Sequence, residues 1–489
     1  MISFMLNDEL VHISKIDNNC TVLEWLRENQ SLCGTKEGCG SGDCGACTVV
    51  LAELNDSQNG LEYRAINSCI TFLSALDGKQ LITVEHLADG NALHPVQQAM
   101  VDKHGSQCGF CTPGFVMPMF SLYKTRESQE QSSPTAELNR HQIDNALSGN
   151  LCRCTGYRPI IDAALDACEA PSADKFSANS TATIENLKAL PQNSGTDGLH
   201  LPDSRAALAD LLVKYPQARL VAGSTDLALE VTQQYKQLPQ LISTRYVPEL
   251  NRIEEKEQEL VIGAAVTYSK LQDKLLHYYP ELEELLARLG SLPIRNQGTL
   301  GGNVANASPI GDTPPVLLAL NAQLTLDNGE QQRTIPVAEF FLDYKKTTLK
   351  KGEWLSDIRI PLPQEKATTE GCLRAYKISK RFEDDISAVC AVFNITLEQG
   401  VVKSLATGFG GVAAVPAVCS ALEQAVTGKA WNLDTMKQGK AILADAFTPI
   451  DDVRASAQYR KTMLVNLWQR FWLESNNQTQ AELRVIQHA

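Results

Sequence analysis

The sequence lacks the features that mark membrane-spanning, secreted or nucleic-acid-binding proteins. Over 489 residues, no apolar run reaches the roughly 20 residues that a membrane-spanning helix requires. Acidic residues outnumber basic ones by 57 to 44, and the net charge of −13 disfavours binding to nucleic acids or anionic lipids. The opening stretch, MISFMLNDELVHIS, has neither the basic start nor the apolar core of a signal peptide. These absences predict a cytoplasmic protein with no nucleic-acid and no membrane partner.

Cysteine is also scarce, but only in the last two-thirds of the chain. Of the 14 cysteines, three lie beyond residue 168, whereas the first third is rich in them. Because the cytoplasm is reducing, this concentration disfavours disulfides and favours metal or redox chemistry. Six cysteines have no partner at metal-ligand spacing and are assigned no role: Cys20, Cys33, Cys168, Cys372, Cys390 and Cys419.

The order of predicted strands and helices indicates an α+β multidomain protein, since a chain of this length exceeds one hydrophobic core. We expect a β-grasp, ferredoxin-like domain first and a four-helix bundle second, followed by a polar, partly disordered linker. A two-part α+β domain without a Rossmann fingerprint and an α+β C-terminal domain come next. The predicted boundaries are 1–87, 88–169, 170–200, 201–365 and 366–489.

The stretch CGSGDCGAC holds the first candidate metal ligands. Cys39, Cys44 and Cys47, followed by Cys69, have the C-x4-C-x2-C…C spacing of plant-type [2Fe–2S] proteins. The intervening glycines allow the backbone to approach a cluster closely, with its N–H groups turned towards the negative charge. Zinc sites rarely use a four-residue step, so the spacing favours iron–sulfur over zinc, and a disulfide network is the least favoured reading.

A second set of four cysteines lies in the motifs SQCGFCTPG and NLCRCTGY: Cys108, Cys111, Cys152 and Cys154. Each pair directly precedes a predicted helix, one from Pro113 and the other from Pro159. Helix N-termini stabilise thiolates and anionic clusters. A structural zinc remains the alternative, but the neighbouring first set favours a second [2Fe–2S] cluster.

Two glycine-rich loops, AGSTDL at 222–227 and TLGGNVANASPIGD at 299–312, lie in the predicted two-part domain. Neither has the G-x-G-x-x-G fingerprint of Rossmann domains. Both loops still suit a pyrophosphate held by backbone N–H groups. Next to two iron–sulfur sites they suggest a flavin, which takes electrons singly and delivers them as a pair.

Five motifs give the chain a close resemblance to a known family: KEGCGSGDCGACTV, GSQCGFCTPGF, GNLCRCTGYRPI, IRNQGTLGGNVANASPIGD and EDDI. In this order, and over nearly the whole chain, they resemble the iron–sulfur and FAD-carrying small subunit of bacterial xanthine dehydrogenases, in the molybdenum hydroxylase family. The resemblance implies that each of the two cysteine sets binds one [2Fe–2S] cluster.

The resemblance also implies contacts with three further groups. Gln107 matches a residue that reaches the molybdopterin of a partner subunit. Tyr344 and Lys345 match positions near NAD, and Asp384 and Asp385 of the EDDI motif belong to the same entrance. The implied FAD-binding residues are Leu220, Val221, Ala222, Gly223, Ser224, Thr225, Asp226, Leu227, Leu289, Thr299, Leu300, Gly301, Gly302, Asn303, Asp312, Leu355 and Lys377.

The resemblance implies that electrons pass from a molybdopterin-binding large subunit through both clusters to FAD and then to NAD+, with the helical-domain cluster nearer the molybdenum. Xanthine or hypoxanthine is expected to be oxidised on that separate subunit, within an α2β2 heterotetramer, so no catalytic residue is expected in this chain. Leu289 departs from the family pattern, because animal relatives carry a flavin-stacking aromatic residue there. Two alternatives stay open: the electron-transfer subunit of an aldehyde or N-heterocycle hydroxylase, and a non-catalytic iron–sulfur sensor.

Overall fold

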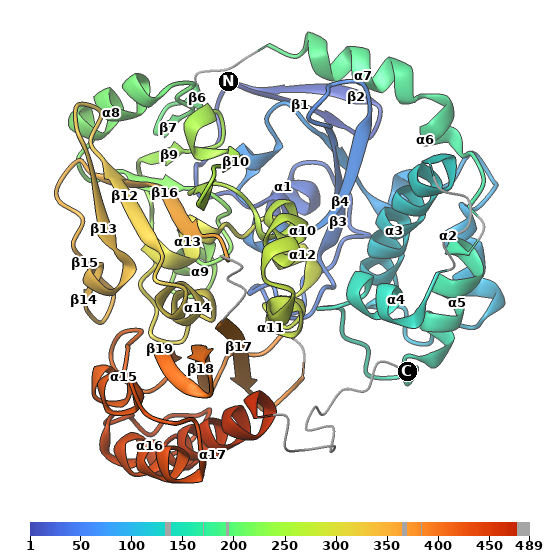
Figure 1. Cartoon of the computed structure of the whole chain (residues 1–489). Helices are drawn as coiled ribbons and strands as arrows, with labels where there is room; N and C mark the ends of the chain where they lie inside the picture. The colour runs from blue at the N-terminus through green and yellow to red at the C-terminus, as the bar shows by residue number, and fades with distance from the viewer. Residues whose placement is uncertain (133–137, 170, 192–194, 364–368, 383, 477–489) are drawn as a thin grey trace. The chain divides into compact units, whose positions relative to one another are not determined.

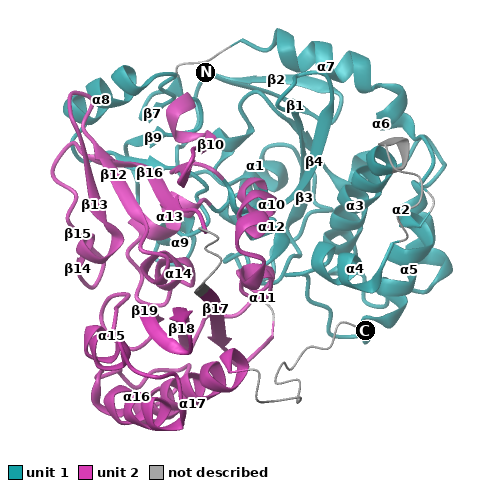
Figure 2. Cartoon of the chain, in the orientation of Figure 1, with its two compact units in different colours: residues 1–247, 267–269, 290–298 teal, residues 248–266, 270–289, 299–489 magenta. Residues whose placement is uncertain are grey.

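The structure, a computed structural model, describes all residues except 133–137, 170, 192–194, 364–368, 383 and 477–489. Figure 1 shows its elements, and Figure 2 shows its two compact units. Unit 1 comprises Met1–Val247, Thr267–Ser269 and Gly290–Gly298, and unit 2 comprises Pro248–Val266, Lys270–Leu289 and Thr299–Ala489. Among the described residues, no helix is both long and apolar enough to span a membrane.

Unit 1 begins with a five-stranded sheet in the order β2-β1-β5-β3-β4. Its strands are β1 (Ile2–Leu6), β2 (Glu9–Ile13), β3 (Thr48–Leu54), β4 (Leu61–Asn67) and β5 (Gln80–Ile82). Strand β1 pairs in parallel with β5 and antiparallel with β2, and the β3–β4 pair is antiparallel. Helix α1 (Val22–Glu28), capped by the Thr21 hydroxyl, packs Trp25 edge-to-face on Phe4 of β1. This arrangement confirms the predicted β-grasp domain.

The predicted helical bundle follows. Its helices are α2 (Pro95–Asp102), α3 (Thr112–Ser132), α4 (Arg140–Ala146) and α5 (Arg158–Cys168). Phe115, Phe120 and Ile160 are buried in one shared core. A proline stands at the second position of both α3 and α5, where its fixed φ suits a first helical turn. Both cysteine pairs therefore lie next to a helix start, as the sequence predicts.

Residues 170–200 differ from the polar, partly disordered linker expected from their composition. Their described part includes α6 (Lys175–Ala178), α7 (Ser180–Ala189), β6 (Gly195–Thr196) and β7 (Leu199–His200). Phe176 of α6 is buried and lies 4.8 Å, centroid to centroid, from the Phe120 ring of α3. Composition alone misses this segment because the groups that stabilise it lie on α2 and α3.

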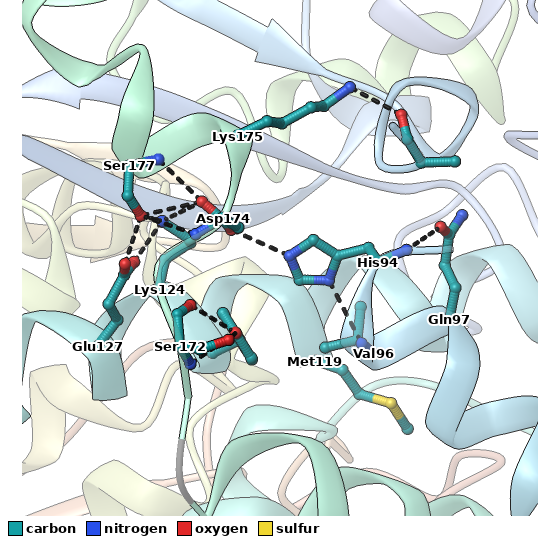
Figure 3. Close-up of polar contacts among 12 residues, drawn as sticks. His94, Val96, Gln97, Met119, Lys124, Glu127, Ser172, Asp174, Lys175 and Ser177 are labelled. Atoms are coloured by element: carbon teal, nitrogen blue, oxygen red, sulfur yellow. Dashed lines mark hydrogen bonds and ion pairs between the residues drawn. The ribbon is translucent and has the colours of Figure 1, made fainter. Parts of the chain in front are cut away.

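Asp174, the N-cap of α6, lies at the centre of a buried polar network (Figure 3). Its carboxylate oxygens are 2.9 Å from Lys124 Nζ and 3.0 Å from His94 Nε2. Lys124 also pairs with Glu127. Val96 N donates to His94 Nδ1, so the proton of the neutral ring lies on Nε2 and points at Asp174. The network fastens the start of α6 to α2 and α3.

The rest of unit 1 is a small α/β part built on the four-stranded sheet β6-β7-β9-β8. Strands β8 (Arg219–Val221) and β9 (Leu241–Ser243) are parallel, and helices α8 (Arg205–Lys214) and α9 (Leu227–Thr232) accompany them in the chain. Helix α12 (Leu292–Arg295), also in unit 1, packs against β4 of the β-grasp domain. Val221 and Leu241 of this part share one hydrophobic core with Trp25 and Phe72 of the β-grasp domain. Unit 1 therefore runs past the domain boundary expected near residue 200.

Unit 2 begins with a five-stranded antiparallel sheet in the order β10-β11-β16-β12-β13. Its strands are β10 (Ile253–Glu255), β11 (Glu259–Gly263), β12 (Gln323–Asp327), β13 (Gln332–Pro336) and β16 (Trp354–Pro361). The antiparallel pairing differs from the parallel sheet of a Rossmann domain, in agreement with the missing fingerprint. The accompanying elements are α10 (Tyr268–Tyr278), α11 (Glu283–Ala287), α13 (Leu300–Ala305), α14 (Thr313–Ala319), β14 (Phe341–Asp343) and β15 (Lys346–Thr347).

An α+β part closes the described chain, as predicted. The antiparallel meander β17 (Thr369–Ile378), β18 (Val389–Glu398) and β19 (Val401–Gly410) packs on α15 (Ser420–Val426), α16 (Leu433–Asp445) and α17 (Ala457–Ser475). Phe393 of β18 stacks on Phe471 of α17 with 5.1 Å between ring centroids. Trp468 is fully buried, and its indole N–H donates to Met436 O at 2.9 Å. Large aromatic side chains thus join the helices to the sheet.

Replacing Asp174 by Asn should destabilise unit 1 by about 3 kcal/mol, because one partner of a buried charge pair is lost. The measurement is urea unfolding followed by circular dichroism. Asp144→Asn is the matched control, since Asp144 pairs with Arg140 on the surface of α4. That change should cost at most about 0.5 kcal/mol. Equal losses in the two variants would contradict a special role for the buried network.

The same network makes a prediction about acid. Burial alone would raise the pKa of Asp174. Hydrogen bonds from His94 and Lys124 lower it by more than burial raises it, so this pKa lies well below its usual range. A carboxyl with a depressed pKa stabilises the folded chain above the pKa of the unfolded chain, about 3.9, and this stabilisation is lost as pH falls below it. As pH falls below about 3.9, the free energy of unfolding should therefore decrease less steeply in the Asp174→Asn protein than in the parent.

Candidate functional site

The first predicted cysteine set assembles within unit 1. Cys39, Cys44 and Cys47 lie on the loop between α1 and β3, and Cys69 lies on the short turn Ser68–Ile70 after β4. The Cys47 and Cys69 sulfurs are 3.2 Å apart, and the Cys39 thiol interacts with both Cys44 and Cys69. Cys47 and Cys69 are buried, whereas Cys39 and Cys44 are partly exposed. The structure thus brings all four predicted ligands together.

Hydrogen bonds to these sulfurs fit a thiolate site. Ser41 N and Asp43 N donate to Cys39 Sγ at 3.4 and 3.3 Å. Hydrogen bonds from the Cys44 and Cys69 thiols lower the pKa of Cys39 well below its usual value. The same bonds raise the pKa of Cys44 and of Cys69. A hydrogen bond from the Cys69 thiol also lowers the pKa of Cys47. The set therefore favours thiolates at Cys39 and Cys47, and the thiolate is the form that binds metal.

Two glycines of this loop are required by close packing. A Cβ on Gly38 would lie 2.6 Å from Cys44 Sγ. Gly45 has a φ of +68°, and a Cβ there would lie 2.8 Å from Asn150 Cα. Both distances are shorter than van der Waals contact, so a larger residue would displace a cysteine-bearing segment.

The second predicted set assembles at the N-terminal ends of α3 and α5. Cys154 Sγ lies 3.7 Å from Cys108 Sγ and 4.0 Å from Cys152 Sγ, and Cys111 interacts with Cys152. Burial opposes ionisation of Cys152, but hydrogen bonds from the hydroxyl and N–H of Thr155 outweigh it and lower its pKa to about 7. Cys108 and Cys154 are exposed. This set is a thiolate site that opens onto the surface of the helical domain.

In both sets the sulfurs contact one another in a row. The rows are Cys44–Cys39–Cys69–Cys47 and Cys111–Cys152–Cys154–Cys108. Two thiolates on one tetrahedral metal lie about 3.8 Å apart, and the sulfur pairs here lie 3.2 to 4.0 Å apart. Within the described ranges, no three or more His, Cys, Asp or Glu side chains are grouped so as to hold a single metal ion. A row of four thiols suits a two-iron cluster, with two thiolates on each iron, better than one zinc.

Eight predicted FAD residues lie where β8 passes into α9, within unit 1. The loop 222–226 joins the two elements, and Ser224 in it has a φ of +60°. Ser224 Oγ donates to Ile70 O at 2.9 Å, and Ile70 directly follows Cys69. Among the described residues, the backbone N–H groups of 223–226 have no hydrogen-bond partner. Consecutive free N–H groups around a left-handed residue form an anion-binding concavity, so this loop fits a pyrophosphate.

The second glycine loop, in unit 2, differs from this expectation. Leu300 N donates to Val266 O and Gly301 N donates to Ala264 O, each at 3.1 Å. Gly302 N donates to the Oγ1 of Thr299, the N-cap of α13, at 3.0 Å. These N–H groups hold α13 in place and are not free for a phosphate. The prediction that both loops bind pyrophosphate through N–H groups is therefore supported by geometry for the first loop only.

The remaining predicted FAD residues also belong to unit 2. Lys377 Nζ lies 2.7 Å from Asp312 Oδ2, and both side chains are buried. Lys377 Nζ also donates to Arg288 O at 2.8 Å. The position of this ammonium is thus fixed by two oxygen atoms. Leu289, Leu300, Gly301, Gly302, Asn303 and Leu355 lie in the same unit.

The residues predicted for NAD and molybdopterin lie on the surface. Tyr344, 58% exposed, and Lys345, with a φ of +53°, form the tip of the β14–β15 hairpin. Asp385 accepts a hydrogen bond from Arg381 N at 2.8 Å. Gln107 is exposed on the loop between α2 and α3. No contact of these residues identifies a ligand, so their roles stay predictions.

Two supporting residues were missed by the sequence reasoning. Asn67 is buried and donates from Nδ2 to Gly42 O at 2.9 Å, which holds the first cysteine loop on β4. Arg288 donates to Lys377 O at 3.1 Å, and the Arg288 carbonyl oxygen accepts a hydrogen bond from Lys377 Nζ. Arg288 therefore holds both the backbone and the ammonium of this lysine. Each residue is a sequence neighbour of a predicted one, but polarity alone does not distinguish it from surface residues.

Four family models match consecutive parts of the chain. They are a 2Fe-2S iron-sulfur cluster binding domain at residues 4–74, a [2Fe-2S] binding domain at 83–165, an FAD binding domain in molybdopterin dehydrogenase at 193–363, and a CO dehydrogenase flavoprotein C-terminal domain at 374–475. Together they cover both cysteine sets and both glycine loops.

Similar full-length proteins are xanthine dehydrogenases. The xanthine dehydrogenase/oxidase of Rattus norvegicus and xanthine dehydrogenase 1 of Arabidopsis thaliana are each 30% identical over 96% of this chain. The xanthine dehydrogenase of Emericella nidulans is 30% identical over 98% of it. The chain spans 38–39% of the length of these relatives.

Solved structures give a second comparison. A Cu,Mo-CO dehydrogenase chain is 26% identical with a TM-score of 0.52, covering 57% of this chain and 97% of that one. A chain of the carbon monoxide dehydrogenase from Hydrogenophaga pseudoflava has the same identity and TM-score, with 57% and 96% covered. The order of the matched domains and these relatives show that the chain belongs to the molybdenum hydroxylase family and carries the two iron–sulfur domains and the FAD domains of that family.

Proposed function

We propose that this chain is the redox subunit of a xanthine dehydrogenase. It takes electrons from a molybdopterin-binding large subunit that oxidises xanthine or hypoxanthine, and it delivers them to NAD+. The observation that carries the proposal is the hydrogen bond from Ser224 Oγ to Ile70 O, because it joins a flavin-domain loop to the turn that carries Cys69. When bound, [2Fe–2S] clusters carry single electrons, and FAD passes them on as a pair.

The two thiol sets differ in exposure, which supports different roles in the relay. In the first set, Cys47 and Cys69 are buried beside the loop 222–226. In the second set, the exposed Cys108 and Cys154 lie on segments that also carry Phe110 and Leu151, each 48% exposed. Exposed apolar side chains that gather on one surface mark a protein–protein contact. We therefore place the large subunit against the second set, where Gln107 is also exposed.

The loop 222–226 supplies the most direct support for FAD. Its free N–H groups form a site for the pyrophosphate, and the resemblance assigns the same residues to FAD. In unit 2, Lys377 and Asp312, both assigned to the same cofactor, form a buried ion pair that fixes the position of the Lys377 ammonium. The chain's part in the reaction is to bind and orient its cofactors and to offset their negative charge.

The acceptor and the assembly complete the proposal. The exposed hairpin tip at Tyr344 and Lys345 is where we place NAD, together with Asp384 and Asp385. The names of the xanthine dehydrogenases support xanthine as the substrate. The proposed partner is a separate molybdopterin-binding large subunit, in an α2β2 assembly. The 14 cysteines are all free, which suits a reducing compartment such as the cytoplasm.

A second candidate is the same electron-transfer role in a hydroxylase of another substrate, such as an aldehyde or an N-heterocycle. The likeness to carbon monoxide dehydrogenase chains favours it, because 57% of this chain is matched by a chain of an enzyme named for a different substrate. Purification of the native complex, followed by metal analysis and oxidation assays with xanthine, aldehydes and N-heterocycles, distinguishes the two. The non-catalytic sensor is disfavoured by the match of the FAD domain.

Replacing Cys44 by Ser should remove the first cluster, because one of its four thiolates is lost. Iron content should fall from about four to about two atoms per chain. In the complex, electron flow from the partner's substrate to NAD+ should stop. Oxidation of NADH by an artificial dye should persist, since those electrons enter at the flavin and bypass this set.

Cys33→Ser is the matched control, because Cys33 is exposed on the same loop but belongs to neither row of sulfurs. It should leave iron content and both activities unchanged. Zinc in place of iron in the parent protein, or simultaneous loss of both activities in Cys44→Ser, would contradict the proposed relay.

Ala222→Glu should weaken FAD binding by roughly tenfold or more, because it puts a carboxylate beside the N–H groups proposed to bind the pyrophosphate. Ala222 is exposed, so the new side chain has room. Fluorescence titration of the flavin-free protein with FAD measures the affinity. Ala421→Glu, at an exposed position of α15, is the control and should bind FAD normally. Unchanged affinity in Ala222→Glu would place the pyrophosphate elsewhere.

A further inference from the structure

Asn150 connects three segments that carry or adjoin cysteine ligands in unit 1. Its side chain is buried, and Nδ2 donates to Gly45 O at 3.0 Å and to Gly114 O at 2.7 Å. Gly45 lies within the first cysteine loop, and Gly114 lies in the first turn of α3, just after the second set's first pair. Asn150 itself stands two residues before Cys152. One amide group therefore links the first thiol set to both halves of the second.

The three segments meet with almost no space between them. A Cβ on Gly114 would collide with Gly45 O and would lie 3.0 Å from Ala46 Cα. Beside this contact, Leu151 N donates to Cys44 O at 3.0 Å. The junction is thus made of backbone on all sides, and the Asn150 amide is the side chain inserted into it.

The chemistry of the junction requires an amide. Nδ2 has two hydrogens and donates to two backbone carbonyls. Gly114 O lacks its usual helical donor because residue 118 is proline, whereas Gly45 O also accepts from Thr48 N and Thr48 Oγ1. Asn150 Oδ1 is buried without a partner among the described residues. A buried, unpaired oxygen costs free energy, so any stabilisation by this side chain comes from the N–H donors of Nδ2. Asp has the same shape but only acceptors, and Ala has neither donor nor acceptor.

We propose that Asn150 is a positioning residue that fixes the separation and orientation of the two thiol sets, and so controls electron exchange between them. It acts through the backbone of the segments that carry the ligands. The inference rests on the proposed electron-transfer function, because the spacing of the sets affects the reaction only if electrons pass between them. Asn150 lies within the motif GNLCRCTGYRPI, but the family resemblance assigns it no role.

The test is electron paramagnetic resonance of the dithionite-reduced protein, in which two reduced clusters interact magnetically according to their separation and orientation. In Asn150→Ala and Asn150→Asp, each cluster should keep its own signal and the iron content should equal that of the parent. The splitting caused by the interaction between clusters should be lost or displaced. A general loss of stability does not produce this pattern, because it would lower the iron content and broaden the individual signals.

Asn394→Ala is the matched control. Asn394 Nδ2 donates to Ala319 O at 3.1 Å in unit 2, so the change removes a similar amide–carbonyl bond away from the thiol sets. It should leave the splitting intact. Splitting unchanged in both Asn150 variants, at full iron content, would overturn the inference.

If both variants lose a cluster, the milder Asn150→Ser decides, because its hydroxyl keeps one donor. At full iron content, an altered splitting in this variant supports the inference and an unaltered one overturns it. A parent protein without two iron–sulfur signals would refute the proposed function itself, before any variant is compared.

Discussion

Close contact between backbone segments around the sulfurs is the constraint on which the rest of unit 1 depends. Four thiolates brought within contact of one another repel unless N–H groups face them, and the backbone comes close to them most easily where residues in the loop carry no side chain. In the first loop, Gly38 leaves room for Cys44 Sγ and Gly45 leaves room for Asn150, while the N–H groups of Ser41 and Asp43 donate to Cys39 Sγ. The contact of Gly114 with Gly45 extends the constraint to α3. The β-grasp domain and the helical bundle therefore cannot move independently at this point without displacing a cysteine segment.

Hydrophobic burial ties a third part of the chain to the same constraint. Val221 and Leu241, on strands beside the loop 222–226, lie in one core with Trp25 and Phe72 of the β-grasp domain. That loop also contacts Ile70 through Ser224. Families defined by sequence similarity end at 74, 165 and 363, whereas the first compact unit includes all of residues 1–247. Conserved chemistry and cooperative packing divide this chain differently, because ligand spacing is local in sequence and core packing is not.

The same distinction explains what the sequence could and could not predict. Cys39, Cys44 and Cys47 lie within nine residues, so their spacing alone predicts the ligands and the type of cluster. The helix starts at α3 and α5 follow from prolines next to the cysteines. In contrast, Asp174 depends on Lys124, which is 50 residues away, and composition suggested only a linker there. Likewise, the glycine-rich sequence suggests that the N–H groups of residues 300–302 are available to a ligand, but they donate hydrogen bonds to residues 264, 266 and 299. In both examples the structure depends on contacts between residues that are far apart in the chain, and a single sequence does not reveal which distant residues make contact.

Burial and hydrogen bonding act in opposite directions on the two thiol sets. Burial of Cys47 and Cys69 disfavours added negative charge, so burial alone would make the first set the poorer acceptor of electrons. That would oppose the proposed electron flow towards the flavin. The N–H groups of Ser41 and Asp43, which donate to Cys39 Sγ, offset that charge. The second set, with Cys108 and Cys154 exposed, obtains the same compensation from water. The glycine-rich loop is therefore needed where solvent is excluded, because there the backbone has to replace it.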